Sequence, residues 1–124
     1  MFVPQAPTGW SQGQSHGLPA VIPAGSPGQI VSNVINTFGL NKGAVGLQST
    51  QAGNLTVQRY ADAAGQIPLP AVVNGAPTVA IVANTPICVT WADGTPTGSI
   101  QITITNSSGS TAANLTNLTV NLGP

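Results

Sequence analysis

The chain has 124 residues, of which only Lys42, Arg59, Asp62 and Asp93 carry a formal charge, and its net charge is zero. About one quarter of the residues in an ordinary soluble domain are charged. Two basic residues are too few to follow a phosphate backbone, so we expect no nucleic-acid binding. The hydrophobic fraction of 41% provides enough apolar surface for a core, which excludes the usual highly charged type of disordered chain.

Residues 1–28 form a compositional block in which prolines alternate with glycines. This spacing opposes a helix and weakens any ladder of backbone hydrogen bonds, so the block predicts an extended arm. The arm also carries large apolar side chains, which flexible linkers rarely need. A disordered tail is the alternative, but we expect an arm that orders against a partner surface. Its predicted anchors are Phe2, Val3, Trp10, Leu18, Val21 and Ile22.

Residues 29–38 are compatible with either a helix or a strand. Their apolar positions recur at the spacing of a helical stripe, whereas their β-branched residue types favour a strand. Gly39 would end either element. The composition favours the strand slightly, and both interpretations stay open. The apolar positions are Ile30, Val31, Val34, Ile35 and Phe38.

From residue 44 onward, the pattern is that of short strands separated by turns. Residues 100–105 show the clearest alternation, with isoleucine on one face and glutamine or threonine on the other. Roughly seven or eight such strands, with a turn about every 8–12 residues, are typical of an antiparallel sandwich or barrel. The candidate strands cover residues 44–48, 55–60, 68–73, 78–83, 87–91, 100–105 and 115–122, with the segment at 29–38 as a possible eighth.

The predicted fold is therefore all-β, with an antiparallel β-sandwich domain over residues 29–124 that follows the extended N-terminal arm 1–28. A jelly-roll-like arrangement is preferred over an immunoglobulin-like one, because eight candidate strands fit it. The Cys…Trp…Cys spacing of true immunoglobulin domains is also absent.

The titratable residues are few and scattered along the chain. Cys88 lies in an apolar run and is predicted to be a small buried hydrophobe. Asp62 follows Arg59 by three residues, which predicts a local ion pair, and Asp93 precedes a glycine in a turn. A Ser-His-Asp triad could use only His16, which lies in the arm. We therefore expect no enzyme activity, no cofactor and no metal site.

No segment of the sequence resembles a targeting signal or a membrane span. Residues 1–20 lack the basic start and apolar centre of a signal peptide, and several prolines interrupt them. No apolar run approaches the roughly 20 residues that a membrane helix needs. We expect no contact with a membrane, and a protein that is used inside a cell or exported in a particle assembled in the host cytoplasm.

The outer faces of the predicted sheets carry threonine, glutamine, asparagine and serine in place of charge. Free proteins protect their strand edges with charged side chains, especially lysine. Almost none are available here, which predicts that neighbouring subunits cover these surfaces. Thr103 and Thr105 on one face could suggest an ice- or sugar-binding array. Such an array needs the same ranks on adjacent strands, and no internal repeat is visible.

Three features together resemble the cement or decoration proteins of tailed-phage capsids: the Pro/Gly-rich block 1–28, the β-rich body 44–122, and the polar stretch 106–116. The likeness extends over most of the chain and consists of composition and pattern. The stretch 106–116 is also similar to the final hairpin of many sandwich domains, including adhesin modules. The resemblance implies a non-enzymatic protein that binds a capsid lattice, often as a trimer or dimer, and bridges adjacent capsid subunits.

We therefore expect a virion structural protein that binds and stabilises a capsid shell through its β-domain and its arm. Its expected partners are the major capsid protein or other shell subunits, and further copies of itself in a dimer or trimer. One alternative is a vertex, spike or minor coat protein of a virion. Another is a carbohydrate- or surface-binding β-sandwich module, such as an adhesin or fibre tip. That alternative requires an exposed aromatic platform, and only 4% of the residues are aromatic.

Overall fold

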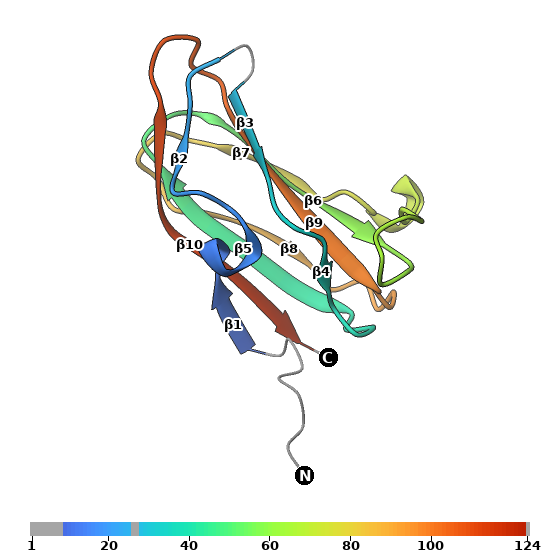
Figure 1. The fold of residues 1–124 in the computed structure, drawn as a ribbon. Helices are drawn as coiled ribbons and strands as arrows, with labels where there is room; N and C mark the ends of the chain where they lie inside the picture. The colour runs from blue at the N-terminus through green and yellow to red at the C-terminus, as the bar shows by residue number, and fades with distance from the viewer. Residues whose placement is uncertain (1–8, 26–27, 124) are drawn as a thin grey trace.

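The computed structural model of the chain describes residues 9–25 and 28–123, which form two five-stranded antiparallel sheets (Figure 1). One sheet has the order β1-β10-β5-β8, with β2 also paired to β10. The other has the order β3-β9-β6-β7, with β4 also paired to β9. The strands are β1 Gly9–Gln12, β2 Val21–Ile22, β3 Gly28–Val31, β4 Ile35–Asn36, β5 Lys42–Ser49, β6 Gly53–Tyr60, β7 Thr78–Ile81, β8 Ile87–Trp91, β9 Ser99–Asn106 and β10 Ala113–Gly123; the 3₁₀ turns are η1 Gly13–His16 and η2 Ala71–Val73.

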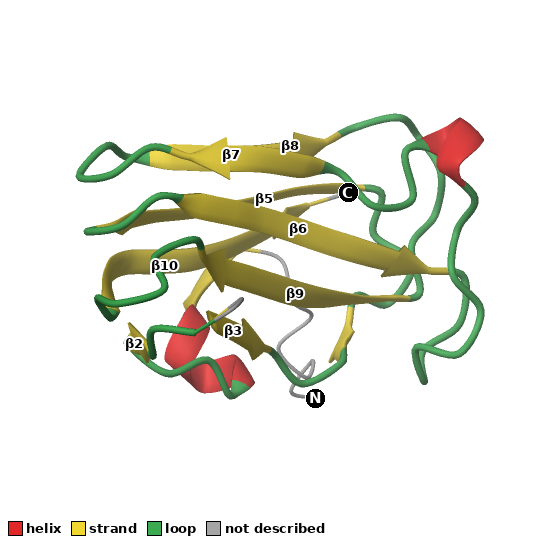
Figure 2. Ribbon diagram, turned by 90° about the horizontal axis from the view of Figure 1, so that it is seen from above, coloured by secondary structure: helices red, strands yellow, loops and turns green. Residues whose placement is uncertain are grey.

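The strand order is that of a jelly roll. Counting β1 with β2 as one strand position and β3 with β4 as the next, the sheets have the orders 1-8-3-6 and 2-7-4-5. Successive positions thus alternate between the sheets, apart from the hairpin of β6 and β7. Figure 2 shows the strands of one sheet covering those of the other. The predicted all-β antiparallel sandwich is confirmed, and the strand order is the jelly-roll one.

The core lies between the two sheets and follows the two-residue period of the strands. In β9, Ile100, Ile102 and Ile104 are fully buried and alternate with half-buried polar residues. Their neighbours Leu55 and Val57 in β6 are buried as well. Because successive strand side chains point to opposite faces, β6 and β9 each turn one face into this core and the other face outward. No helix among the described residues is long and apolar enough to cross a membrane.

The ambiguous segment 29–38 contains no helix. Parts of it form β3 and β4, which both pair with β9. Between these strands, buried Ser32 keeps its contact with β9, because its backbone N–H donates to the Ile102 carbonyl and its Oγ accepts the Ile102 N–H. Phe38, expected on the helical stripe, has a positive φ of 53° and is 65% exposed. The residue types were therefore a better guide than the spacing.

Residues 9–22 are built into the sandwich, which differs from the extended arm predicted for 1–28. β1 pairs with β10 from Gly9 opposite Leu122 to Gln12 opposite Thr119. β2 pairs with the start of β10, and Leu18 and Ile22 lie in the core with 2% and 0% of their surface exposed. Proline and glycine prevent long ladders, but the two- and four-residue strands seen here fit between them.

Candidate interaction surface

Arg59 is fully buried and joins two loops at one end of the sandwich. Its Nη1 and Nη2 donate to the two carboxylate oxygens of Asp93 at 2.8 and 2.9 Å. Nη1 also donates to the carbonyls of Val73 and Asn74, Nη2 to that of Thr95, and Nε to the Oγ1 of Thr97. The guanidinium therefore connects the loop after β6 to the loop after β8, in the bidentate geometry that suits arginine.

This pairing replaces the predicted local ion pair between Arg59 and Asp62, which was wrong. Arg59 follows Leu55 and Val57 on the inward face of β6, whereas Asp62 lies beyond the strand end. The Asp62 carboxylate instead accepts the backbone N–H groups of Gln66 and Ile67, which lower its pKa. It therefore shapes the loop after β6. The segment 68–73, a candidate strand, forms only a single bridge to β6 and the turn η2.

Hydrogen bonds from Arg59, together with its charge, lower the pKa of Asp93 to about 2, against an ordinary value of 3.8. A carboxyl whose pKa is depressed on folding adds stability that is present above its ordinary pKa. This contribution is lost as the pH falls through the folded-state value. We expect the urea midpoint to fall between about pH 4 and pH 2, and Asp93→Asn to remove most of this fall.

Asp62→Asn is the matched control, because Asp62 is also an aspartate with a lowered pKa but takes part in no ion pair among the described residues. Urea unfolding followed by circular dichroism at about five pH values would give both slopes. If the urea midpoints of the two variants fell equally with pH in the acid range, the assignment of the acid destabilisation to Asp93 would be contradicted.

The outer face of the β3-β9-β6-β7 sheet is uncharged over its described strands. Arg59 is the one charged residue in these strands, and it points into the core. The outward positions carry amides, hydroxyls, two small apolar groups and one aromatic ring. They are Gln29, Val31, Asn54, Thr56, Gln58, Tyr60, Thr78, Ala80, Gln101, Thr103 and Thr105.

Threonines form one rank across three strands of this face. Thr103 in β9 is opposite Thr56 in β6, which is opposite Thr78 in β7. The Oγ1 atoms of Thr56 and Thr78 are hydrogen-bonded at 3.0 Å. The next rank consists of Thr105, Asn54 and Ala80, so the threonine pattern does not repeat. The face thus has a single row of threonines, which the sequence did not reveal because it contains no repeat. A single row is not the regular lattice that an ice-binding array needs.

The other sheet has a similar outer face and uncharged edges. Lys42 at the start of β5 is its only charged residue among the described strands. The strands at the margins of both sheets, β1 to β4, β7 and β8, contain no charged residue, and none is longer than five residues. Very short edge strands limit pairing with strands of other molecules. The sheet edges are therefore protected by the shortness of these strands rather than by charged side chains.

Those predicted anchors of the arm that the structure describes lie in different environments. Leu18 and Ile22 are buried in the core, where no partner can reach them. Val21, the neighbour of Ile22 in β2, is 46% exposed. Trp10 is in β1, in register with Asn121. Phe2 and Val3 lie outside the described residues, so their role stays a prediction.

Cys88 is exposed on β8, which corrects the prediction of a buried hydrophobe. Val89 and Trp91 in the same strand face the core, so the two-residue period turns Cys88 outward. His16 Nε2 is 2.7 Å from Ser11 Oγ, and partial burial lowers the pKa of His16. Both aspartates are engaged elsewhere, by Arg59 and by the loop after β6. The described residues therefore form no Ser-His-Asp triad.

Two hollows lie on the β1-β10-β5-β8 sheet. One, of about 300 Å³, is lined by residues of β5, β8 and β10, including Lys42, Ala44 and Asn121. The other, of about 250 Å³, lies at the irregularity of β10 between Thr116 and Thr119 and includes Gln12. Apart from Lys42, no titratable side chain lines either hollow. These hollows therefore contain no acid–base pair, and no described group of His, Cys, Asp and Glu could hold a metal ion.

The sequence matches no protein-family model and no curated protein. Among solved structures it is similar to PirA, with 13% identity and a TM-score of 0.46 over 83% of this chain and 89% of that one. A family 6 carbohydrate-binding module has 10% identity and a TM-score of 0.47 over 94% and 93%. The module CBM36, in complex with calcium and xylotriose, has 12% identity and a TM-score of 0.41 over 83% and 78%. These values say nothing about what this chain binds, and the resemblance to decoration proteins stays a prediction.

Proposed function

We propose that the chain is a non-enzymatic structural protein of a virus particle that decorates and stabilises the capsid shell. The observation that carries this proposal is the uncharged outer face of the β3-β9-β6-β7 sheet. Of the four charged residues, Arg59 and Asp93 neutralise each other, and Asp62 binds its own loop. The molecule therefore has little charge with which to keep other protein surfaces away.

Burying such a surface against a neighbouring protein costs little free energy. Amide and hydroxyl groups lose little on dehydration when they find hydrogen-bond partners, whereas a buried charge is costly unless it is paired. The proposed partners are the major capsid protein or other shell subunits, and further copies of the chain in a dimer or trimer. Repetition of a modest contact over many copies would give strong overall attachment.

The test uses a pair of lysines placed on the proposed contact face. Thr56→Lys/Thr103→Lys changes two outward residues that are opposite each other in β6 and β9. We expect the parent chain to form a dimer or trimer by light scattering, and the double variant to lower its association constant at least about tenfold, which is about 1.4 kcal/mol. Mass spectrometry of purified virions should detect the parent chain in many copies.

The matched control is Ser107→Lys/Ser110→Lys, which adds the same charge to the exposed loop before β10. It should associate like the parent chain. A parent chain that stays monomeric at high concentration, and is absent from virions, would contradict the proposal. Equal loss of association in both lysine variants would assign the effect to net charge rather than to this face.

A further inference from the structure

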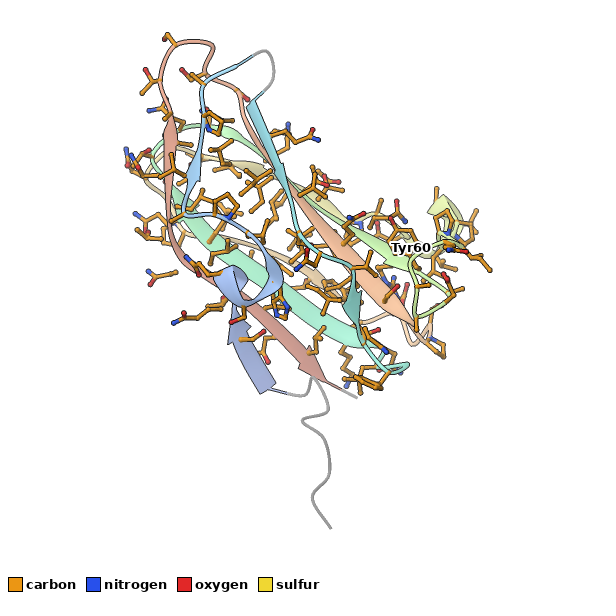
Figure 3. All side chains as sticks on the ribbon, viewed as in Figure 1. Tyr60 is labelled. Carbon is orange, nitrogen blue, oxygen red and sulfur yellow. The ribbon has the colours of Figure 1, made fainter. Side chains whose placement is uncertain are left out.

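We propose that Tyr60, Gln58 and Gln101 form a binding site for a neutral oligosaccharide on the outer face of the β3-β9-β6-β7 sheet. Gln58 in β6 is opposite Gln101 in β9, and Tyr60 is the next outward residue of β6. All three side chains are half-buried. Figure 3 shows Tyr60 at the end of the sandwich where the chain leaves β6. The site goes beyond capsid decoration and does not depend on it.

The hydrogen bonds of the two glutamines hold their amides in one orientation. Gln58 Nε2 donates to the carbonyls of Arg59 and Gly75 at 2.9 and 3.0 Å. Gln101 Nε2 donates to the Ser32 carbonyl at 3.1 Å, and its Oε1 accepts the Tyr60 hydroxyl at 3.3 Å. A carbonyl can only accept a hydrogen bond, so each amide nitrogen is fixed in place.

The remaining hydrogen-bonding capacity suits a sugar. Gln58 Oε1 has no donor among the described residues, and Gln101 Nε2 has used one of its two N–H groups. An acceptor and a donor are therefore available on two residues that are opposite each other. Gly75 and Ser32 direct the two amides to opposite sides of the β6–β9 pair, so separate hydroxyls of an oligosaccharide can donate to Gln58 Oε1 and accept from Gln101 Nε2. The Tyr60 ring supplies the apolar surface on which the C–H face of a pyranose can pack.

The charge around the site selects a neutral ligand. The nearest cation in the sequence, Arg59, is fully buried and paired with Asp93, so a carboxylate sugar would find no cationic partner on this face. A phosphate or sulfate group would likewise find no cationic partner on this face. A neutral ligand, by contrast, exchanges its water for amide and hydroxyl partners without leaving a charge unpaired.

The loop after β6 is held in place beside these residues. The Ser99 Oγ donates to the Asp62 carbonyl at 2.6 Å, which ties the loop to β9. A side chain on Gly65 would come within 3.0 Å of Val34, so the loop also contacts the segment between β3 and β4. The site is thus built on two long strands and bounded by a fixed loop, which lowers the cost of ordering on binding.

The experiment titrates the ¹⁵N-labelled full chain with cellotriose and follows backbone amide shifts by NMR. We expect shifts confined to β6, β9 and the loop after β6, with a Kd on the order of 1 mM. Tyr60→Ala and Gln101→Ala should each raise the Kd at least about tenfold. Tyr60→Phe, which keeps the ring, should raise it less. Thr90→Ala, an exposed residue of β8 on the other sheet, should leave it unchanged.

Maltotriose and β-1,4-galactotriose extend the neutral probes, and trigalacturonate is the charged one. No shift with any neutral trisaccharide at about ten times the expected Kd would overturn the proposal. Shifts that persist unchanged in Gln101→Ala and Tyr60→Ala alike, or equal binding of trigalacturonate, would also overturn it. Thermal unfolding of each variant identifies any that fails to fold, in which case the other two variants decide. Light scattering of each variant separates this result from the assembly role, because sugar binding that is lost while the solution mass stays that of the parent chain is lost at this site alone.

Discussion

Replacement of Arg59 by methionine is expected to lower the free energy of unfolding by about 3–5 kcal/mol. The change removes the only hydrogen-bond donor of the Val73 and Asn74 carbonyls among the described residues. It also removes the guanidinium from Asp93, which keeps the Thr95 N–H, and from the Thr95 carbonyl, which keeps the Thr97 hydroxyl. Each buried acceptor that loses its partner costs about 1–3 kcal/mol, although exposed parts of these loops regain water. Urea unfolding followed by circular dichroism would measure the difference at neutral pH.

Arg59→Lys and Asp93→Asn are the informative controls. Lysine keeps the charge but cannot reach both carboxylate oxygens and three carbonyls at once, so it should lose a large part of the stability. Asp93→Asn should cost less than Arg59→Met, because the Asp93 side chain is 32% exposed and the Arg59 hydrogen bonds to carbonyls survive. An Arg59→Met variant within about 1 kcal/mol of the parent chain would contradict a structural role for this network.

The Arg59 network also explains how a domain with long loops at one end can keep that end ordered. The loop after β6 spans residues 61–77 and contains little regular structure. The guanidinium is held to both loops, and its carbon is 6.0 Å from the centre of the Trp91 ring. The proposed sugar site uses the same anchorage, since Gln58 Nε2 binds the Gly75 carbonyl in this loop. Loss of Arg59 should therefore weaken oligosaccharide binding as well as folding.

The two-residue period predicted the core of the strands well. It identified the inward set in β9, and it placed Leu55, Val57 and Arg59 on one face of β6. The alternation is a local property of the backbone, so it can be predicted without knowing which strands are neighbours. The predicted sandwich follows from the same signal, together with the spacing of the turns.

The partner of Arg59 could not be predicted from spacing, because Asp93 is 34 residues away and comes close only through the jelly-roll order. One signal was present in the sequence. An arginine in phase with buried aliphatic residues needs a counter-ion on another strand or loop, and with two aspartates in the chain only Asp93 was far enough away. The exposure of Cys88 could also have been predicted, because the alternation that points Val89 and Trp91 inward points Cys88 outward.

The candidate site was less predictable than the core. The register that aligns Gln58 with Gln101, and brings Tyr60 beside them, depends on the pairing of β6 with β9, which are separated by three other elements of the chain. Composition indicated that the outer faces would be neutral. Only the strand pairing shows which neutral side chains lie side by side on this face and which of them are hydrogen-bonded to each other.

Ile22→Ala is expected to lower the free energy of unfolding by about 2–5 kcal/mol, the usual cost of a large-to-small change in a core. Ile22 is fully buried, pairs with Ala113 at the start of β10, and has its carbonyl bound by Asn106 Nδ2. An arm that only docks on a partner would show no such effect in the isolated chain. Thermal and urea unfolding of the purified variant would measure the change.

Val21→Ala is the matched control, because Val21 is the other residue of β2 and is largely exposed. It should change the free energy of unfolding by no more than about 0.5 kcal/mol. Deletion of residues 9–22 should unfold the domain, since it removes β1 and β2 from β10 and opens the core at Leu18. A stable, folded deletion variant, or equal effects of Val21→Ala and Ile22→Ala, would instead support an arm that is separate from the sandwich.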